Sequence, residues 1–200
     1  AAGVSFNTQQ TARRSALEQE IAYTVKSKSL PELMQSNAEL LSRAGISDSL
    51  IQAFIQSPVL SPSKKTAITT YLVRLEGVNR LDAFIEASLA VNNEVDALLL
   101  TELAAMLFHY YTNRERFSTF HFFMEQPTVL TQTGRFILFD NSDLMIWTEA
   151  IDKQYAEAAA HADASGYKDW KIVSRAAMSP VASDKLSALG YQLESEFTGR

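Results

Sequence analysis

Acidic side chains behind an apolar run are the residues of this chain best placed to do chemistry. Asp140 and Asp143 follow the run 136–139, which is apolar at every position. Such a run is typical of a strand covered on both faces, and ligands of a parallel sheet bind where its strands end. Two carboxylates at that place could hold a divalent ion for hydrolysis. Asp140 and Asp143 are therefore candidate catalytic residues, with Glu102 or His121 as a third group.

The segment 137–144 resembles the nucleophile motif of haloacid-dehalogenase-type phosphatases, in which strand-end carboxylates hold Mg²⁺ and attack phosphorus. That motif has a second acid two residues after the first, whereas this chain has Ser142 there. The part of the chain after Asp140 is also too short for that fold's sheet and later motifs. A second interpretation needs no catalysis: Asp140, Asn141 or Ser142 caps a helix, and Asp143 lies in its first turn.

Side chains that bind metals form a second set of candidates. Glu102 lies in an apolar stretch, and His109 follows seven positions later. That spacing is about 10 Å along a helix, too far for both to hold one metal unaided. His121 and Glu125 are four positions apart and could share one. Neither HExxH nor the paired Glu-x-x-His pattern is present, so we expect no metal and no cofactor. If a metal were bound, Glu102, His121 and Glu125 would be its candidate ligands.

Aromatic residues are concentrated in the middle of the chain. Ten of the twenty lie between positions 108 and 147. Large aromatic side chains usually build cores, so a junction core is the first interpretation. A helix cannot bury the whole run 120–123 on one face, so some of these side chains are left for a partner. The candidate partner surface consists of Phe117, Phe120, Phe122 and Phe123.

Composition excludes several classes of protein. The 200 residues are 46% hydrophobic and carry a net charge of −5, which is typical of a globular chain and not of a disordered one. Nucleic acids and anionic membranes require clustered basic side chains, so we expect neither as a partner. The adjacent basic pairs are Arg13-Arg14 and Lys64-Lys65, which we predict to occupy solvated helix positions. The lack of cysteine excludes disulfides and thiolate nucleophiles.

Two further expectations concern the location of the protein. The beginning at Ala1 is typical of a mature exported protein, so we expect it to be secreted or periplasmic, with a cytoplasmic protein as the alternative. The most apolar stretch, 95–111, carries Asp96, Glu102 and His109. We therefore predict a buried helix there and no integral membrane segment.

The elements that must position these residues fall into two parts. Residues 1–126 predict an array or bundle of short amphipathic helices, with starts near 31, 47, 61, 79, 93 and 113. The sequence 29–32 is a capping box with Pro31 in the first turn. Residues 127–200 predict a small α/β part of about three strands, packed on the helices or continuous with them as one domain.

The predicted positions of the later elements follow the same rules. A short strand is expected at 128–131, and the main strands at 135–139, 170–174 and 191–197. Helices are expected at 142–164 and 179–190. The order strand–helix–strand–helix–strand favours parallel strands with right-handed crossovers.

Two functional hypotheses follow. The first is a non-enzymatic interaction module, or an accessory or structural protein, exported and bound to a protein partner or to itself. The support for it is the well-capped helices, the aromatic-rich junction and the lack of a recognisable set of catalytic residues. The alternative is a divalent-metal-dependent hydrolase with its site at the end of the strand 135–140.

Overall fold

The computed structural model describes residues 16–123, 126–142, 145, 147–164, 167 and 169–197. This part of the chain divides into two compact units. The helical unit comprises the described residues up to Glu76 together with Leu81–Arg114, and the sheet unit comprises Gly77–Arg80 and the described residues from Glu115 onward. None of the helices in the described ranges combines the length and apolarity needed to cross a bilayer.

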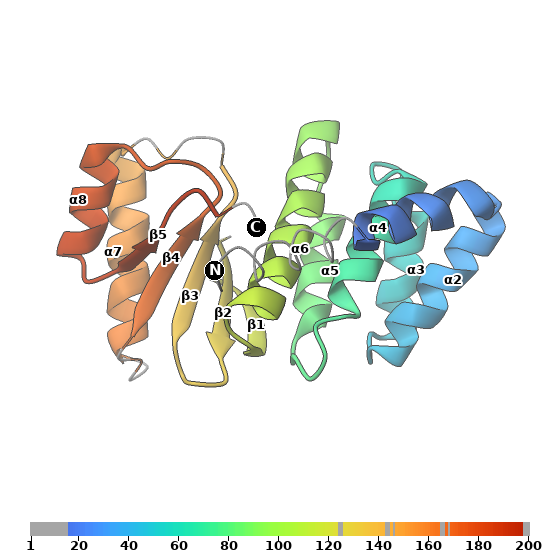
Figure 1. Cartoon of the computed structure of the whole chain (residues 1–200), viewed down its shortest axis with the longest axis horizontal. Coiled ribbons are helices and arrows are strands. Elements are labelled where there is room, and N and C mark those ends of the chain that lie inside the picture. The colour runs from blue at the N-terminus through green and yellow to red at the C-terminus, as the bar shows by residue number, and fades with distance from the viewer. Residues whose placement is uncertain are drawn as a thin grey trace, which may run out of the picture. The chain divides into compact units, whose positions relative to one another are not determined.

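The helical unit is built from short helices with defined starts. Its elements are a helix over 16–27, α2 (Leu30–Arg43), α3 (Asp48–Gln56), α4 (Pro62–Leu72), α5 (Leu81–Leu89) and α6 (Glu94–Asn113) (Figure 1). At the start of α2, the Glu32 carboxylate accepts hydrogen bonds from the N–H and the Oγ of Ser29 at 2.7 and 2.6 Å. These two bonds lower the pKa of Glu32. Glu32 thus closes the predicted capping box at 29–32 by accepting hydrogen bonds from Ser29, the residue that precedes the helix.

Packing in the helical unit links helices close in sequence. Helix α4 packs against α2 and α6, and α3 packs against α2 and α5. The centre is filled by side chains with no exposed surface, namely Phe54, Ile68, Phe84 and Leu107. The start of α2, the end of α3 and the start of α4 lie close together, and they line the pocket described below.

The sheet unit is a five-stranded mixed sheet in the order β1-β2-β3-β4-β5. Its strands are β1 (Phe117–Phe123), β2 (Gln126–Thr131), β3 (Phe136–Asp140), β4 (Trp170–Ser174) and β5 (Gln192–Glu194). The first three strands form an antiparallel meander, and β3, β4 and β5 run parallel. The parallel strands are joined by α7 (Glu149–Ala164) and α8 (Pro180–Ala188), which cover the same face of the sheet (Figure 1).

The prediction of about three strands is wrong, because the sheet has five. The main error is the helix expected from Asn113 to 125, since residues 117–123 form β1. That segment contains four Phe and one Thr, residue types that fit a pleated surface well. Neighbouring aromatic side chains point to opposite faces of a strand, so a run that no helix face could bury is accommodated in the sheet.

The helix expected to start near 79 begins at Leu81, and Asn79 bridges to β1 instead. Its N–H donates to the Ser118 carbonyl at 2.9 Å, and its own carbonyl accepts from the Phe120 N–H at 2.9 Å. The Asn79 side-chain amide donates to the same Ser118 carbonyl at 3.1 Å. The segment 77–80 therefore belongs to the sheet unit although it lies between two helices of the helical unit.

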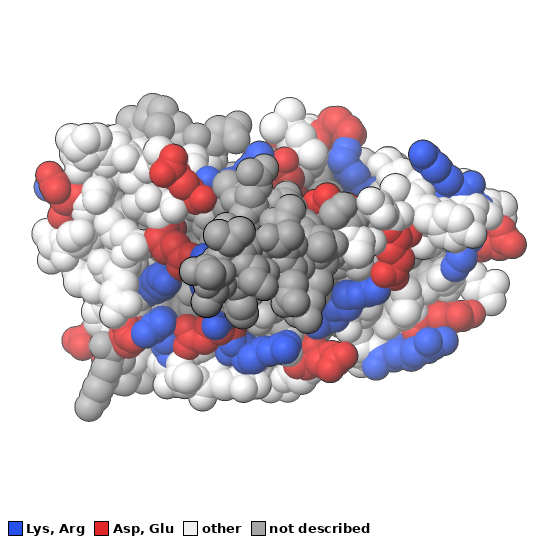
Figure 2. All heavy atoms as spheres, in the orientation of Figure 1, with Lys and Arg blue, Asp and Glu red and all other residues white. Residues whose placement is uncertain are grey.

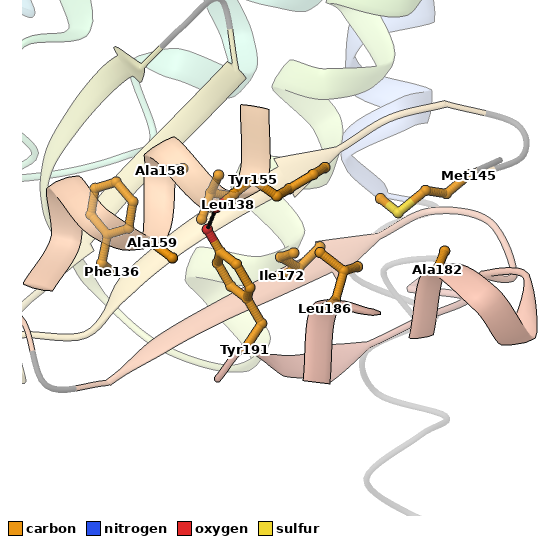
Figure 3. Close-up of a cluster of buried hydrophobic side chains, with 10 residues drawn as sticks. All are labelled: Phe136, Leu138, Met145, Tyr155, Ala158, Ala159, Ile172, Ala182, Leu186 and Tyr191. Atoms are coloured by element: carbon orange, nitrogen blue, oxygen red, sulfur yellow. Dashed lines mark hydrogen bonds between the residues drawn. The ribbon is translucent and has the colours of Figure 1, made fainter. Parts of the chain in front are cut away.

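One core fills the space between the sheet and its two helices. Strand residues Phe136, Leu138 and Ile172 meet Tyr155 and Ala158 of α7, and the core also contains Met145, Ala159, Ala182, Leu186 and Tyr191 (Figure 3). The Tyr191 hydroxyl donates to the backbone carbonyl of Tyr155 at 2.9 Å, shown as the dashed line in Figure 3. This bond ties the segment after α8 to the middle of α7.

The two tyrosines of this core predict a loss of stability at alkaline pH. Burial raises the pKa of both Tyr155 and Tyr191, and the charge of Asp140 adds to the effect at Tyr155. Unfolded tyrosines ionise near pH 10, whereas these two stay protonated in the folded state. Unfolding above about pH 10 therefore releases protons, so the free energy of unfolding falls as the pH rises beyond that point.

Urea unfolding of the sheet unit over this pH range tests the prediction. Both tryptophans of the chain, Trp147 and Trp170, lie in the sheet unit, so their fluorescence reports its unfolding. The double variant Tyr155→Phe/Tyr191→Phe should lose stability less steeply above pH 10 than the unchanged protein does. Tyr23, which is 73% exposed, provides the control, since Tyr23→Phe should keep the full slope. Equal slopes in all three proteins would contradict the prediction.

The glycine that follows α8, Gly190, is predicted to be sensitive to substitution. Gly190 has φ +88°, and a Cβ there would lie 3.3 Å from Nε1 of Trp170. Gly134 has φ +87° with open space around it. Gly134→Ala should cost about 1 kcal/mol because of its left-handed backbone alone, and Gly190→Ala should cost more because the indole must also move. Tryptophan-monitored unfolding checks both variants, and equal losses would refute the role assigned to Trp170.

Candidate functional site

A pocket of about 370 Å³ lies in the helical unit, between the start of α2, the end of α3 and the start of α4. Its volume falls within the range of small-ligand pockets, about 300–1,000 Å³. The apolar side chains in its wall are Leu30, Leu33, Met34, Ile55, Pro58, Leu60 and Pro62. The polar ones are Asn37, Gln56, Ser57, Ser61 and Lys65. Among the described residues of this wall, Lys65 is the one with an ionisable side chain.

Helix ends shape the pocket. Helix α3 ends at Gln56, and the loop that follows turns at Pro58 into α4. Ser61 caps α4 by accepting a hydrogen bond from the Lys64 N–H at 3.3 Å, and Pro62 occupies the first helical position. Leu30 begins α2 and is 52% exposed, so it lies at the rim of the pocket.

Lys65 is buried in the wall of the pocket and is only 8% exposed. Its Nζ donates hydrogen bonds of 2.6 Å to the carbonyls of Ile55 and Ser57. These carbonyls lie at the end of α3, where the helix dipole presents partial negative charge to the ammonium. Burial lowers the pKa of Lys65, because the charged form loses its water. The two carbonyls favour the protonated form, so the side chain acts as a donor.

Asn37 is the second buried polar group of the pocket and is 3% exposed. Its Nδ2 donates to Thr66 Oγ1 at 3.1 Å, and that hydroxyl donates to the Pro62 carbonyl at 2.9 Å. This chain of hydrogen bonds fixes α2 against the first turn of α4. Asn37 and Lys65 thus place two polar groups in a wall that is otherwise largely apolar.

Sequence reasoning missed this pocket because it placed Lys65 in solvent. The prediction of two solvated positions at Lys64-Lys65 is wrong for Lys65. The signal was present in α4: Lys65 lies three positions before Ile68 and seven before Leu72, on the buried face of the helix. Lys64 is also less exposed than predicted, since its side chain is 16% exposed and makes an ion pair with Glu94.

Asp140 lies at the end of β3, as predicted, next to Ser174 at the end of the parallel strand β4. Its carboxylate accepts hydrogen bonds from the N–H and Oγ of Ser142 at 3.1 and 2.9 Å. Ser174 Oγ lies 3.3 Å from the same carboxylate and 3.0 Å from the Ala176 carbonyl. A hydroxyl has one proton, so it donates to only one of these two acceptors at a time. Among the described residues, the groups that hydrogen-bond to the Asp140 carboxylate are thus hydroxyls and a backbone N–H, whereas Asp143 is not described.

The metal candidates lie on different elements. Glu102 and His109 belong to α6 in the helical unit, and His121 belongs to β1 in the sheet unit. Glu125 is outside the described residues. Burial, together with the charge of Arg80, lowers the pKa of His121. In the described ranges, no three His, Asp or Glu side chains gather in a way that could hold a metal ion.

The four phenylalanines of the candidate partner surface separate into two kinds. Phe117 and Phe120 are 0% and 1% exposed, and the Phe117 ring packs edge-on against Phe139 at 5.9 Å. Phe122 and Phe123 are half-buried, and Phe123 stacks on His161 at 4.5 Å. The partner surface predicted for this region therefore depends on Phe122 and Phe123.

Charges of both signs are scattered among uncharged side chains on the described part of the face shown in Figure 2. Lys and Arg side chains lie among Asp and Glu side chains there and do not gather into one patch. The ion pairs of the described residues include Arg74–Glu20 in the helical unit and Arg135–Asp169 in the sheet unit. Mixed charge of this kind gives the visible face no stripe of one sign.

No protein-family model, curated protein or solved structure matches this chain.

Proposed function

We propose that this protein is a non-enzymatic binding module, and that the pocket of the helical unit receives an apolar group of a protein partner. The observation that carries the proposal is the pocket itself: about 370 Å³, with a mostly apolar wall and one ionisable side chain. Ligand pockets are typically apolar with a few polar groups that fix orientation. Lys65 and Asn37 are such groups.

The chemistry of the wall supports binding and not catalysis. A catalytic pocket needs a group that can accept a proton or attack substrate. The ammonium of Lys65 donates to two carbonyls at 2.6 Å, and both bonds stabilise its protonated form. The other polar side chains of the wall, those of Asn37, Gln56, Ser57 and Ser61, have no base beside them within the wall.

The hydrolase hypothesis has less support. It needs a third metal-binding or acidic group beside Asp140, and the described side chains that hydrogen-bond to the Asp140 carboxylate belong to Ser142 and Ser174. A cysteine-free composition is compatible with export, and secretion or periplasmic location belongs to the proposal, to be tested by cell fractionation. A second copy of the chain is the rival partner, which sedimentation analysis would detect.

Selection from a random peptide library displayed on phage tests the proposal. Selected peptides should share an apolar residue, and their affinity should fall more than about tenfold for Met34→Trp, which fills the pocket. Met178 is half-buried in the sheet unit, so Met178→Trp is the matched control and should keep the affinity. Failure to enrich peptides, or equal binding to both variants, would overturn the proposal.

A further inference from the structure

The buried ammonium of Lys65 has no carboxylate partner among the described residues. Its contacts are the carbonyls of Ile55 and Ser57, which carry only partial charge. The neighbouring Lys64 makes its ion pair with Glu94. Buried lysines are rare unless they are paired, because the desolvated charge is costly. The pocket thus contains a positive charge that a bound anion would neutralise.

Unused hydrogen-bond donors accompany this charge. An ammonium has three protons, and the structure gives two of them acceptors. The amide Nδ2 of Asn37 has two protons, and one bonds to Thr66 Oγ1. Each group therefore has one donor left, and both residues lie in the wall of the pocket. Two donors and one charge suit the two oxygens of a carboxylate, whereas phosphate groups are usually held by more donors.

We propose that the ligand of the helical-unit pocket is an apolar group that carries a carboxylate, with the carboxylate held by Lys65 and Asn37. The apolar part lies against Leu33, Ile55 and Leu60, which are at most 5% exposed. The inference rests on the proposed function and adds the chemical class of the ligand. Two sources provide this chemistry: the last residue of a peptide with its free α-carboxylate, and a free aliphatic acid.

Calorimetric titration with matched probes tests the inference on the unchanged protein. The first pair is octanoate and octanamide, which have the same chain length and differ in charge. We expect octanoate to bind about 10- to 100-fold more tightly, as a charge-assisted hydrogen bond implies. The second pair is a leucine-terminated peptide with a free or an amidated carboxyl end, and the free acid should bind more tightly by a similar factor. Tighter binding of the peptide acid would identify a peptide end as the source, whereas tighter binding of octanoate would identify a free acid and overturn the protein partner proposed above.

A matched pair of lysine variants tests the residue. Lys65→Gln keeps amide protons for the α3 carbonyls but removes the charge, so octanoate should then bind no better than octanamide. Lys64→Gln removes the neighbouring charge, which lies outside the pocket wall, and should leave the preference intact. If Lys65→Gln does not fold, the comparison of charged and uncharged probes on the unchanged protein still decides.

The outcomes separate this inference from the proposed function. Equal affinity for octanoate and octanamide would overturn the carboxylate inference and leave an apolar pocket in place. A preference for octanoate that persists in Lys65→Gln would also overturn it, because another group would then hold the anion. If neither the octyl probes nor the peptides bind, the inference and the proposed function both fail.

Discussion

Replacing Phe117 with alanine is expected to lower the free energy of unfolding of the sheet unit by about 3–5 kcal/mol. Phe117 is fully buried in β1, and its ring meets Phe139 of β3 edge-on at 5.9 Å. Removal of the ring leaves a cavity beside Phe139 that the close-packed surroundings cannot refill. Urea unfolding followed by tryptophan fluorescence measures the loss.

Phe123 provides the comparison for this prediction. It lies in the same strand but is half-buried, with its ring stacked on His161. Phe123→Ala should therefore cost clearly less stability than Phe117→Ala. If the two costs were equal, or Phe117→Ala were harmless, residues 117–123 would not have the burial that β1 gives them.

Replacing Leu30 with aspartate is expected to weaken the binding of octanoate or of an acid-terminated peptide by at least about tenfold. Leu30 lies at the rim of the pocket, so the change removes apolar contact and adds a charge that repels a carboxylate. The protein should stay as stable as before, within about 0.5 kcal/mol, because the position is exposed. Aspartate is also favourable at the start of a helix.

Leu98 is the matched control in the same unit. It is 50% exposed, against 52% for Leu30, and it lies on α6 outside the pocket wall. Leu98→Asp introduces the same charge and should leave octanoate affinity unchanged. If calorimetry showed that both variants lose octanoate affinity equally, the effect would come from net charge. That result would contradict binding of octanoate in the pocket.

Several helix starts could be predicted from the sequence because their signals are local, although the helix expected at 142–164 begins only at Glu149. Ser61-Pro62 and Ser179-Pro180 begin α4 and α8, and each serine accepts a hydrogen bond from the backbone at its own cap. The Asn93 side chain caps α6 in the same way. Such motifs involve residues three positions apart, so no knowledge of the rest of the fold is needed.

Strand β1 could not be predicted in this way, because the identity of the segment depends on distant pairing. Residues 117–123 pair with 126–131, and the bridge from Asn79 adds a third segment from far away in the sequence. The local sequence of the aromatic run is compatible with either a helix or a strand. Tertiary pairing decides between them, and it also places Asn79, near which a helix start was predicted, in the sheet unit.

The candidate site was not predicted from the sequence for a similar reason. Lys65 stands beside Lys64, and a pair of lysines on a helix is usually solvated. Burial of one of them depends on where α3 ends, since its last carbonyls accept the ammonium. Asp140, in contrast, was correctly placed at the end of a strand, because an apolar run followed by an acid is a local pattern.

The measurement that tests the central claim most directly is a methyl NMR titration of the whole protein with octanoate. If the helical-unit pocket is the binding site, the methyl signals of Leu33, Ile55 and Leu60 should shift in a saturable way. The methyl signals of Ile137 and Ile172, in the core of the sheet unit, should stay in place. Shifts confined to the sheet unit, or no shifts at all, would contradict the assignment of function to this pocket.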